Sequence, residues 1–390
     1  VMLDFVFRIV KLAGKCWSLD LGIYDGFFVE IVEALGEKGH QEYYAKGYMA
    51  TPPFVDPHFH LVAALSCGLP RLNQSGTLLE GIQIWGELKP ELTAEALKSR
   101  ALELLTWSIA KGTLAIRTHV DVTDPSLLAV DVLLEVRDEM KEWVDLQIVA
   151  FPQDGVLRTR GGKDLLLSAL DKGVDIVGGI PHYEGTMAEG SNAISWLCEV
   201  ADSRGLMIDM HCDESDDPHS RHIEHLVYES RSRGLGDRVT ASHLTSMHSM
   251  DNYYVSKLLP LMAEAGVQVI CNPLINIHIQ GRHDGYPKRR GLTRVPELLA
   301  SGVNVAFGHD CVMDPWYPMG SHDMLEVAHM GAHCLQMMGA SHAGTLFEMI
   351  NGRGAEVMKI KGYGISTGTT HDCVILEAEK YMEDLRWMRH

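Results

Sequence analysis

The sequence predicts an α/β protein, a closed (β/α)8 TIM barrel that carries a small β-sandwich subdomain formed by the N- and C-terminal segments. Two observations favour the barrel: short apolar, β-branched runs recur along the chain, and amphipathic helical patterns separate them. From the second run onward the runs begin about 30 residues apart, which is the length of one strand–helix unit. An open doubly wound sheet is the alternative, but no GxGxxG motif follows the first strand to support it.

The eight runs define the expected strands. They are 53–58, 113–120, 145–151, 174–180, 206–212, 238–243, 267–272 and 303–309. Between them, stretches such as 94–111 and 124–143 repeat apolar residues with the i, i+3, i+4 and i+7 spacing of an amphipathic helix. Apolar strands that alternate with such helices are typical of a parallel sheet covered on its outer face.

The chain is expected to divide into three segments. Residues 1–50 form the N-terminal part of the small β subdomain, 51–360 the barrel, and 361–390 the C-terminal part of the subdomain. Short β-prone pieces occur in the first segment, and 364–376 has a similar pattern. Because the two outer segments flank the barrel, we expect them to meet. The chain begins without Met, and whether its ends are trimmed stays open.

Composition excludes several classes of partner. The 34 basic and 52 acidic side chains give a formal charge of −18, which argues against nucleic acid or an anionic membrane surface. No apolar run approaches the ~18–20 residues that span a bilayer, and no signal-peptide pattern opens the chain. The eight cysteines, Cys16 among them, contain no CxxC pair, so we expect reduced thiols and no Cys-based zinc site. These features predict a soluble, cytoplasmic protein.

Every expected strand delivers a polar or ionisable side chain at its C-terminal end. In a barrel of this kind the strand ends form one mouth, and the mouth carries the chemistry. The side chains at or just beyond the strand ends are, in chain order, His58, His60, His119, Asp121, Gln153, His182, His211, Glu214, His243, Asn272, His309 and Asp310. The sequence therefore predicts a functional site at this mouth.

The end of the first strand has the spacing of a metal site. His58 and His60 are two residues apart, so both imidazoles face the same side of a strand. His211 on the fifth strand and Asp310 on the eighth complete a set of three histidines and one aspartate, which leaves room for water as catalytic metals need. We predict one divalent metal ion, zinc or ferrous iron, because this ligand set suits both.

Two further residues have the chemistry of proton transfer. Glu214 follows His211 by three residues, and a carboxylate beside a metal-activated water can serve as general acid and base. A solvated loop glutamate is the alternative, because 213–217 is rich in acids. His243 would stabilise hydroxide or a developing oxyanion. Four other strand-end residues either bind the metal or orient its ligands: His119, Asp121, His182 and His309.

The motifs around these residues resemble those of the amidohydrolase superfamily, specifically the bacterial cytosine deaminase family. The matching segments are 52–61, 73–82, 117–122, 145–155, 211–214, 238–249, 272–282, 286–291 and 308–318. The resemblance covers roughly 50–360 and is weaker in the tails. It implies hydrolytic deamination of a free pyrimidine base with release of ammonia, and a homo-oligomeric enzyme that acts on a small nucleobase.

The resemblance also implies roles for individual residues. The metal ligands would be His58, His60, His211 and Asp310, with Glu214 as proton shuttle and His243 and Asp310 as further catalytic groups. Gln153 would bind the amide face of the pyrimidine, and Leu78, Phe151 and Trp316 would form pocket walls. Two-metal members of the superfamily use a carboxylated lysine at the end of strand 4. The corresponding segment here, 178–182, contains no lysine, so a single metal is implied.

One position departs from the family pattern. Cytosine deaminases carry two adjacent aspartates, GHDD, where this chain has Cys311 in second place. A thiol removes a charge and a strong acceptor and leaves a smaller, more apolar wall. We therefore hypothesise that the pocket accepts a C5 substituent, so that 5-methylcytosine is a substrate and cytosine still reacts. Neutral drift at a tolerant position is one alternative, and reactivity of the thiol itself is another.

Other functions stay open at this point. Within enzymes, the substrate could be another cyclic amidine, such as isoguanine, creatinine or an aminotriazine. A non-catalytic barrel that only binds a ligand is a further alternative, and it predicts an incomplete metal set. The zinc deaminases of a different fold use a PCxxC motif, which this chain lacks. Their mechanism is therefore excluded, and so is the usual reason to expect a polynucleotide substrate.

Overall fold

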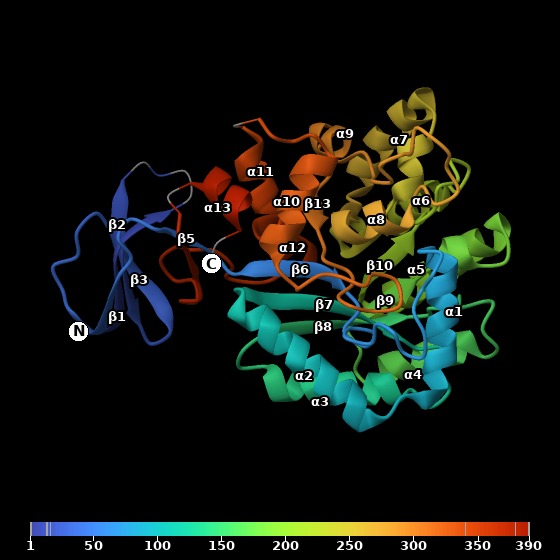
Figure 1. The fold of residues 1–390 in the computed structure, drawn as a ribbon, viewed down its shortest axis with the longest axis horizontal. Helices are drawn as coiled ribbons and strands as arrows, with labels where there is room; N and C mark the ends of the chain where they lie inside the picture. The colour runs from blue at the N-terminus through green and yellow to red at the C-terminus, as the bar shows by residue number, and fades with distance from the viewer. Residues whose placement is uncertain (1, 13–14, 16, 340, 379, 389–390) are drawn as a thin grey trace.

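The computed structural model describes residues 2–12, 15, 17–339, 341–378 and 380–388. Eight parallel strands, each paired with the next, form the sheet of the barrel (Figure 1). In chain order they are β6 (Phe54–Phe59), β7 (Thr113–Asp121), β8 (Asp145–Phe151), β9 (Ile176–Gly179), β10 (Met207–Cys212), β11 (Val239–His243), β12 (Gln268–Cys271) and β13 (Val305–Phe307). Each strand overlaps one predicted run, and the (β/α)8 barrel is confirmed.

Helices lie between and around these strands. They are α1 (Leu78–Leu88), α2 (Ala94–Ala110), α3 (Leu128–Met140), α4 (Gly162–Asp171), α5 (Met187–Arg204), α6 (His222–Arg233), α7 (Asn252–Ala265), α8 (Pro273–Ile279), α9 (Val295–Ala300), α10 (Met324–Cys334), α11 (His342–Met349), α12 (Gly352–Met358) and α13 (Tyr381–Trp387). Four 3-10 turns join them: η1 (Lys89–Glu91), η2 (Pro181–Tyr183), η3 (Gly236–Arg238) and η4 (Thr245–Ser249). None of the described helices is long and apolar enough to cross a membrane.

Threonine side chains begin several of the helices. The hydroxyl of Thr77 accepts the backbone N–H of Glu80 at the start of α1, and Thr93 does the same for α2. This contact satisfies one of the four N–H groups that a helix leaves unpaired at its start. In α2 the buried residues recur three or four positions apart, on the face that covers the barrel, as the sequence pattern predicted.

The small subdomain contains strands from both ends of the chain, as predicted. They are β1 (Leu3–Leu12), β2 (Ser18–Tyr24), β3 (Phe27–Val32), β4 (Gly39–Tyr44), β5 (Met49–Thr51) and β14 (Val374–Leu376). The described strands form one mixed sheet, rather than two packed sheets. The reason is a register shift in β1 between Phe7 and Val10, which lets the first part of β1 pair with β4 and its end with β5.

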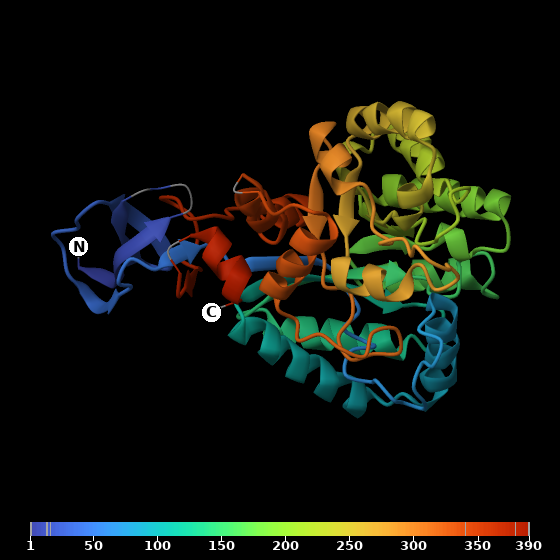
Figure 2. The same ribbon diagram turned by 45° about the horizontal axis from the view of Figure 1, so that its top comes forward.

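The subdomain marks the end of the barrel opposite the predicted site. The strand β6 begins three residues after β5, and both views show the small sheet beside the start of β6 (Figures 1 and 2). The carboxyl ends of the parallel strands therefore lie away from the subdomain. The seven cysteines among the described residues are free thiols, as expected, and Cys16 lies outside the described residues.

Side chains and loop backbone close the barrel between its first and last strands. Among the described residues, β13 and β6 share no continuous ladder, only an isolated bridge between Phe59 and Asp310. Buried Asp56 fills the gap: its Oδ1 accepts the backbone N–H groups of His58 and His309 at 3.2 and 3.1 Å. Its Oδ2 lies 2.8 Å from Nε2 of His322. This closure holds two segments that carry candidate metal ligands.

We expect Asp56→Ala to lower the free energy of unfolding by about 3 kcal/mol, because three buried donors lose their acceptor. Asp56→Asn should cost less, since its oxygen can still accept the two backbone N–H groups. Thermal and urea unfolding of the variants would measure the difference. The control is Asp131→Ala, which removes only an exposed ion pair with Lys172. An Asp56→Ala variant as stable as this control would contradict the role of Asp56.

Candidate active site

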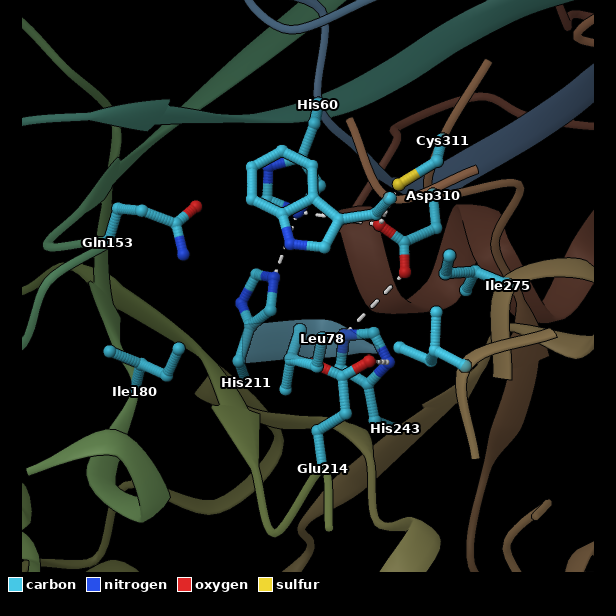
Figure 3. A pocket seen from close by; sticks show the side chains of 12 residues that line it. His60, Leu78, Gln153, Ile180, His211, Glu214, His243, Ile275, Asp310 and Cys311 are labelled. Atoms are coloured by element: carbon cyan, nitrogen blue, oxygen red, sulfur yellow. Dashed lines mark hydrogen bonds and ion pairs between the residues drawn. The ribbon is translucent and has the colours of Figure 1, made fainter. Parts of the chain in front are cut away.

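Four side chains from three strands converge at the mouth of the barrel. His58 lies in β6 and His60 directly follows it, His211 lies in β10, and Asp310 follows β13. The Nε2 atoms of His60 and His211 are 2.9 Å apart. Oδ1 of Asp310 lies 3.4 Å from Nε2 of His60 and 3.7 Å from Nε2 of His58. The structure thus brings the four predicted metal ligands together, and Figure 3 shows His60, His211 and Asp310 around one point.

The protonation of this cluster fits a divalent cation. Burial lowers the pKa of His58, His60 and His211 well below the ordinary value, so the imidazoles are neutral, the form that binds metals. Nε2 of His58 is buried and has no hydrogen-bond partner among the described residues. Burial and nearby Glu214 raise the pKa of Asp310, because the site offers this carboxylate no compensating cation. The residues present can therefore hold a divalent metal ion.

Glu214 and His243 lie together beside this cluster. Oε1 of Glu214 is 3.2 Å from Nδ1 of His243, and Nε2 of His243 is 3.7 Å from Oδ2 of Asp310. Burial raises the pKa of Glu214 to about 8, so the carboxyl group carries a proton at neutral pH. Glu214 is buried, and the solvated-loop alternative is therefore wrong. The side chain can give a proton to a bound molecule or take one from it.

Two asparagine side chains hold this pair in place. The amide of Asn276 in α8 donates to Nδ1 of His243 at 3.1 Å and to Oε1 of Glu214 at 3.3 Å, and Asn272 donates to the same Nδ1 at 3.2 Å. The sequence analysis marked Asn272 as a strand-end residue but gave no role to Asn276. Its signal would have been the one-turn spacing of the two amides at the start of a helix.

A cavity opens onto these groups. Its lining residues are His60, Leu78, Gln153, Ile180, His211, Glu214, His243, Ile275, Ile279, Asp310, Cys311 and Trp316. Gln153 lines the cavity, and Figure 3 shows its side chain on the opposite side of the group from Asp310 and Cys311. A planar polar ligand could therefore be bound by an amide at one edge and by the carboxyl groups at the other.

Four of the five predicted substrate-binding residues line this cavity, and one does not. The ring of Phe151 stacks on the ring of His211 with centroids 4.1 Å apart and is absent from the lining. Phe151 thus packs behind His211, a candidate metal ligand, instead of forming a wall of the cavity. Three apolar lining residues, Ile180, Ile275 and Ile279, were not predicted, because isoleucines that follow a strand or lie in a short helix such as α8 look like ordinary core residues.

Cys311 is a neutral, buried wall residue. Its Sγ lies 3.4 Å from Oδ1 of Asp310, to which the thiol donates. Burial and the neighbouring Asp310 and Asp314 raise the pKa of the thiol well above its ordinary value. A thiol that stays protonated is a poor nucleophile and a weakly polar surface. The chemistry at this position is therefore packing rather than thiolate attack.

The remaining strand-end candidates contact the site indirectly. Nδ1 of His182 donates to the backbone carbonyl of His211 at 3.1 Å, and Nδ1 of His309 donates to that of Cys311 at 3.0 Å. Asp121 accepts the indole N–H of Trp85 at 2.8 Å and pairs with Lys89. His119 lies closer to the candidate metal ligands, with its ring centroid 4.2 Å from that of His58. Apart from His119, these residues orient their neighbours.

A (β/α)8 barrel with buried histidines and carboxyl groups at its mouth has the architecture of a metal-assisted hydrolase. The amidohydrolase family model matches residues 41–383 of the chain. The chain therefore belongs to the amidohydrolase family, and it is a hydrolase that acts on carbon–nitrogen bonds. The resemblance seen in the sequence is confirmed.

Individual relatives narrow the reaction class. A crystal structure of 5-methylcytosine deaminase from Klebsiella pneumoniae, liganded with 5-fluorocytosine, shares 40% identity and a TM-score of 0.96, covering 99% of this chain and 94% of that one. N-isopropylammelide isopropyl amidohydrolase of Pseudomonas sp. (strain ADP) is 27% identical over 96% of this chain and 91% of its own length. Pterin deaminase of Rhizobium rhizogenes is 28% identical over 86% and 77%. These relatives support hydrolytic deamination as the reaction class.

The wall made by Trp316 depends on a glycine in α1. A Cβ atom built at Gly81 would overlap with the indole of Trp316, whereas one at Gly86 in the same helix meets nothing within 4 Å. We expect Gly81→Ala to displace Trp316 and to weaken ligand binding at least tenfold, about 1.4 kcal/mol. Gly86→Ala should leave binding unchanged. Titration calorimetry would compare the two variants, and equal affinities would show that Trp316 does not form this wall.

Proposed function

We propose that this protein hydrolytically deaminates a free pyrimidine base, converting 5-methylcytosine to thymine and cytosine to uracil with release of ammonia. The observation that carries the proposal is the wall of the cavity next to Asp310, where a neutral thiol, Cys311, stands in place of the family's second aspartate. A thiol can pack against a methyl group, while a carboxylate there would be desolvated by it. The similarity to 5-methylcytosine deaminase supports the same substrate class.

In this proposal His58, His60, His211 and Asp310 hold one divalent metal ion, zinc or ferrous iron. When bound, such an ion lowers the pKa of water and so supplies a nucleophile at neutral pH. The protein's own contribution is to place the base. Gln153 binds the amide edge of the ring, and the apolar residues of the cavity exclude bulk water. A base held in this way has its C4 atom directed toward the cluster, which removes the entropy cost of orientation.

The proton transfers follow from the positions of the acidic groups. Asp310 accepts a proton from the attacking water, and Glu214 donates its proton to ring N3, which makes C4 electrophilic. The oxygen of water forms a bond to C4, and the N–H of His243 stabilises the charge that develops on that oxygen. The proton held by Asp310 passes to the exocyclic amine, the C4–N bond breaks to release ammonia, and the hydroxyl group on C4 returns its proton to Glu214 as it becomes the carbonyl of the product. Water and 5-methylcytosine are consumed, and thymine and ammonia are produced.

A second candidate is deamination of another cyclic amidine. The relatives include proteins named for N-isopropylammelide and for pterin, so isoguanine, creatinine and aminotriazines remain candidate substrates. A barrel that only binds its ligand is disfavoured, because such a protein has no need of a complete cluster of metal ligands with an adjacent acid and histidine. A free base also agrees with the acidic composition, which disfavours binding to nucleic acid.

The substrate proposal is tested by ammonia release from cytosine, 5-methylcytosine and isoguanine. We expect the wild type to prefer 5-methylcytosine over cytosine by 10- to 200-fold in kcat/KM, the range for one methyl group. Cys311→Asp should reverse the preference. A tenfold preference of the wild type for cytosine would contradict the role of Cys311, and activity on isoguanine alone would favour the second candidate.

The proton-transfer role is tested with Glu214→Gln. This variant keeps the size of the side chain and its contact with Asn276 but cannot exchange a proton, so we expect kcat to fall about 10²–10⁴-fold with little change in KM. The control is Glu264→Gln, an exposed glutamate on α7. Steady-state kinetics would measure both variants. A decrease of less than tenfold for Glu214→Gln would exclude Glu214 as the proton donor.

A further inference from the structure

A pair of opposite charges lies in the barrel interior, one layer below the metal-ligand candidates. On β7 Arg117 precedes His119 by two residues, and on β10 Asp209 precedes His211 by two. Because side chains alternate along a strand, each charge shares the inward face with the histidine above it. Arg117 and Asp209 have 0% of their surface exposed. A charged pair in a place that barrels fill with apolar residues calls for a reason.

These two residues are the start of a hydrogen-bonded chain. Nη1 of Arg117 donates to Oδ2 of Asp209 at 2.9 Å. Oγ of Ser242, on β11 and also fully buried, donates to Oδ1 of Asp209 at 2.8 Å. The same Oγ lies 2.9 Å from Nδ1 of His58. We call Arg117, Asp209 and Ser242 the relay.

The direction of every bond in the chain is determined by chemistry. A guanidinium group only donates, and an ionised carboxylate only accepts. The single hydroxyl hydrogen of Ser242 therefore goes to Asp209, and the hydroxyl oxygen is left as an acceptor. The group that donates to it is Nδ1–H of His58. Nε2 of His58 then carries the lone pair, and this is the atom that faces Asp310 and has no partner among the described residues.

We propose that the relay positions His58 as a metal ligand: it holds the imidazole in the Nδ1–H tautomer, aims Nε2 at the ion and makes that nitrogen a stronger donor. The inference rests on the proposed assignment of His58 as a ligand. A hydrogen bond to a group backed by a carboxylate raises the basicity of an imidazole, and such contacts typically change metal affinity 10- to 100-fold. Arg117 fixes the position of Asp209 through their 2.9 Å contact, and its own Nη2 donates to the carbonyl of Val357 at 3.0 Å.

One neighbour competes for the same carboxylate. Nε2 of His119 lies 3.6 Å from Oδ1 of Asp209, the oxygen that also accepts from Ser242. The Ser242 contact is 0.8 Å shorter, and it is the one that leads to a metal-ligand candidate. Substitution at Ser242 therefore removes the hydrogen bond to His58 without removing the charge pair, because Arg117, Asp209 and His119 all stay in place.

The test measures the dissociation constant for Zn²⁺ by competition with a chromophoric chelator, in the metal-free full-length chain. Ser242→Ala should bind Zn²⁺ 10- to 100-fold more weakly than the wild type. Ser242→Thr keeps the hydroxyl and should restore affinity to within about threefold, well below that loss. The matched control is Ser230→Ala, which removes another fully buried hydroxyl that donates to the carbonyl of Ala265 at 3.1 Å. It should bind Zn²⁺ like the wild type.

His58→Ala separates failure of the relay from failure of the ligand assignment. Loss of affinity in His58→Ala with wild-type affinity in Ser242→Ala would overturn the relay and leave the ligand set intact. Wild-type affinity in His58→Ala would overturn both. A readout on the wild type alone guards against misfolded variants: ¹⁵N-histidine spectra of the metal-free chain should show His58 protonated at Nδ1. A His58 protonated at Nε2 would overturn the proposal.

Discussion

The organisation of the mouth depends on buried polar groups that cannot satisfy one another. Neutral imidazoles present lone pairs, and Asp310 and Glu214 add carboxyl groups, within a space closed off from water. Burying such groups without partners costs several kcal/mol each. A divalent cation would supply the missing partner, because it accepts lone pairs from imidazole and carboxylate together. The strand ends, the closure of the barrel and the interior charges all serve to hold this arrangement.

Polar contacts at the mouth and in the layer below it hold these buried groups in place. Asp56 ties the backbones of His58 and His309 together where the sheet lacks a ladder. Below the mouth, Arg117 and Asp209 form a charge pair in which each ion is the partner of the other. Among the described residues, several buried atoms without a hydrogen-bond partner lie at the mouth, on His58, His211 and His243. Unsatisfied buried groups gathered in one place favour a binding site there.

The parts of the site that local sequence patterns encode were predictable. Strand positions follow from repeating apolar runs, and the period of two places His58 and His60 on one face. Contacts between distant residues were not predictable: Ser242 meets His58 across 184 residues of sequence, and nothing near Ser242 signals that contact. Phe151 was misplaced for the same reason, since its role depends on which neighbouring ring it packs against. The single sheet of the subdomain depends on one register shift, which propensities do not reveal.

Charge crowding supports the proposed role of the thiol at position 311. The pKa of Asp310 is already raised by burial and by the nearby Glu214 and Asp314. A further carboxylate beside Asp310 would be stable only with a donor from the ligand, such as an exocyclic amine, so it would bind bases through that contact. Cys311 makes no such demand, because its neutral thiol donates to Asp310 and presents polarisable sulfur to the cavity. Under the proposed function, the choice of substrate at this position would depend on shape rather than on hydrogen bonding, and shape is what distinguishes a methyl group from hydrogen.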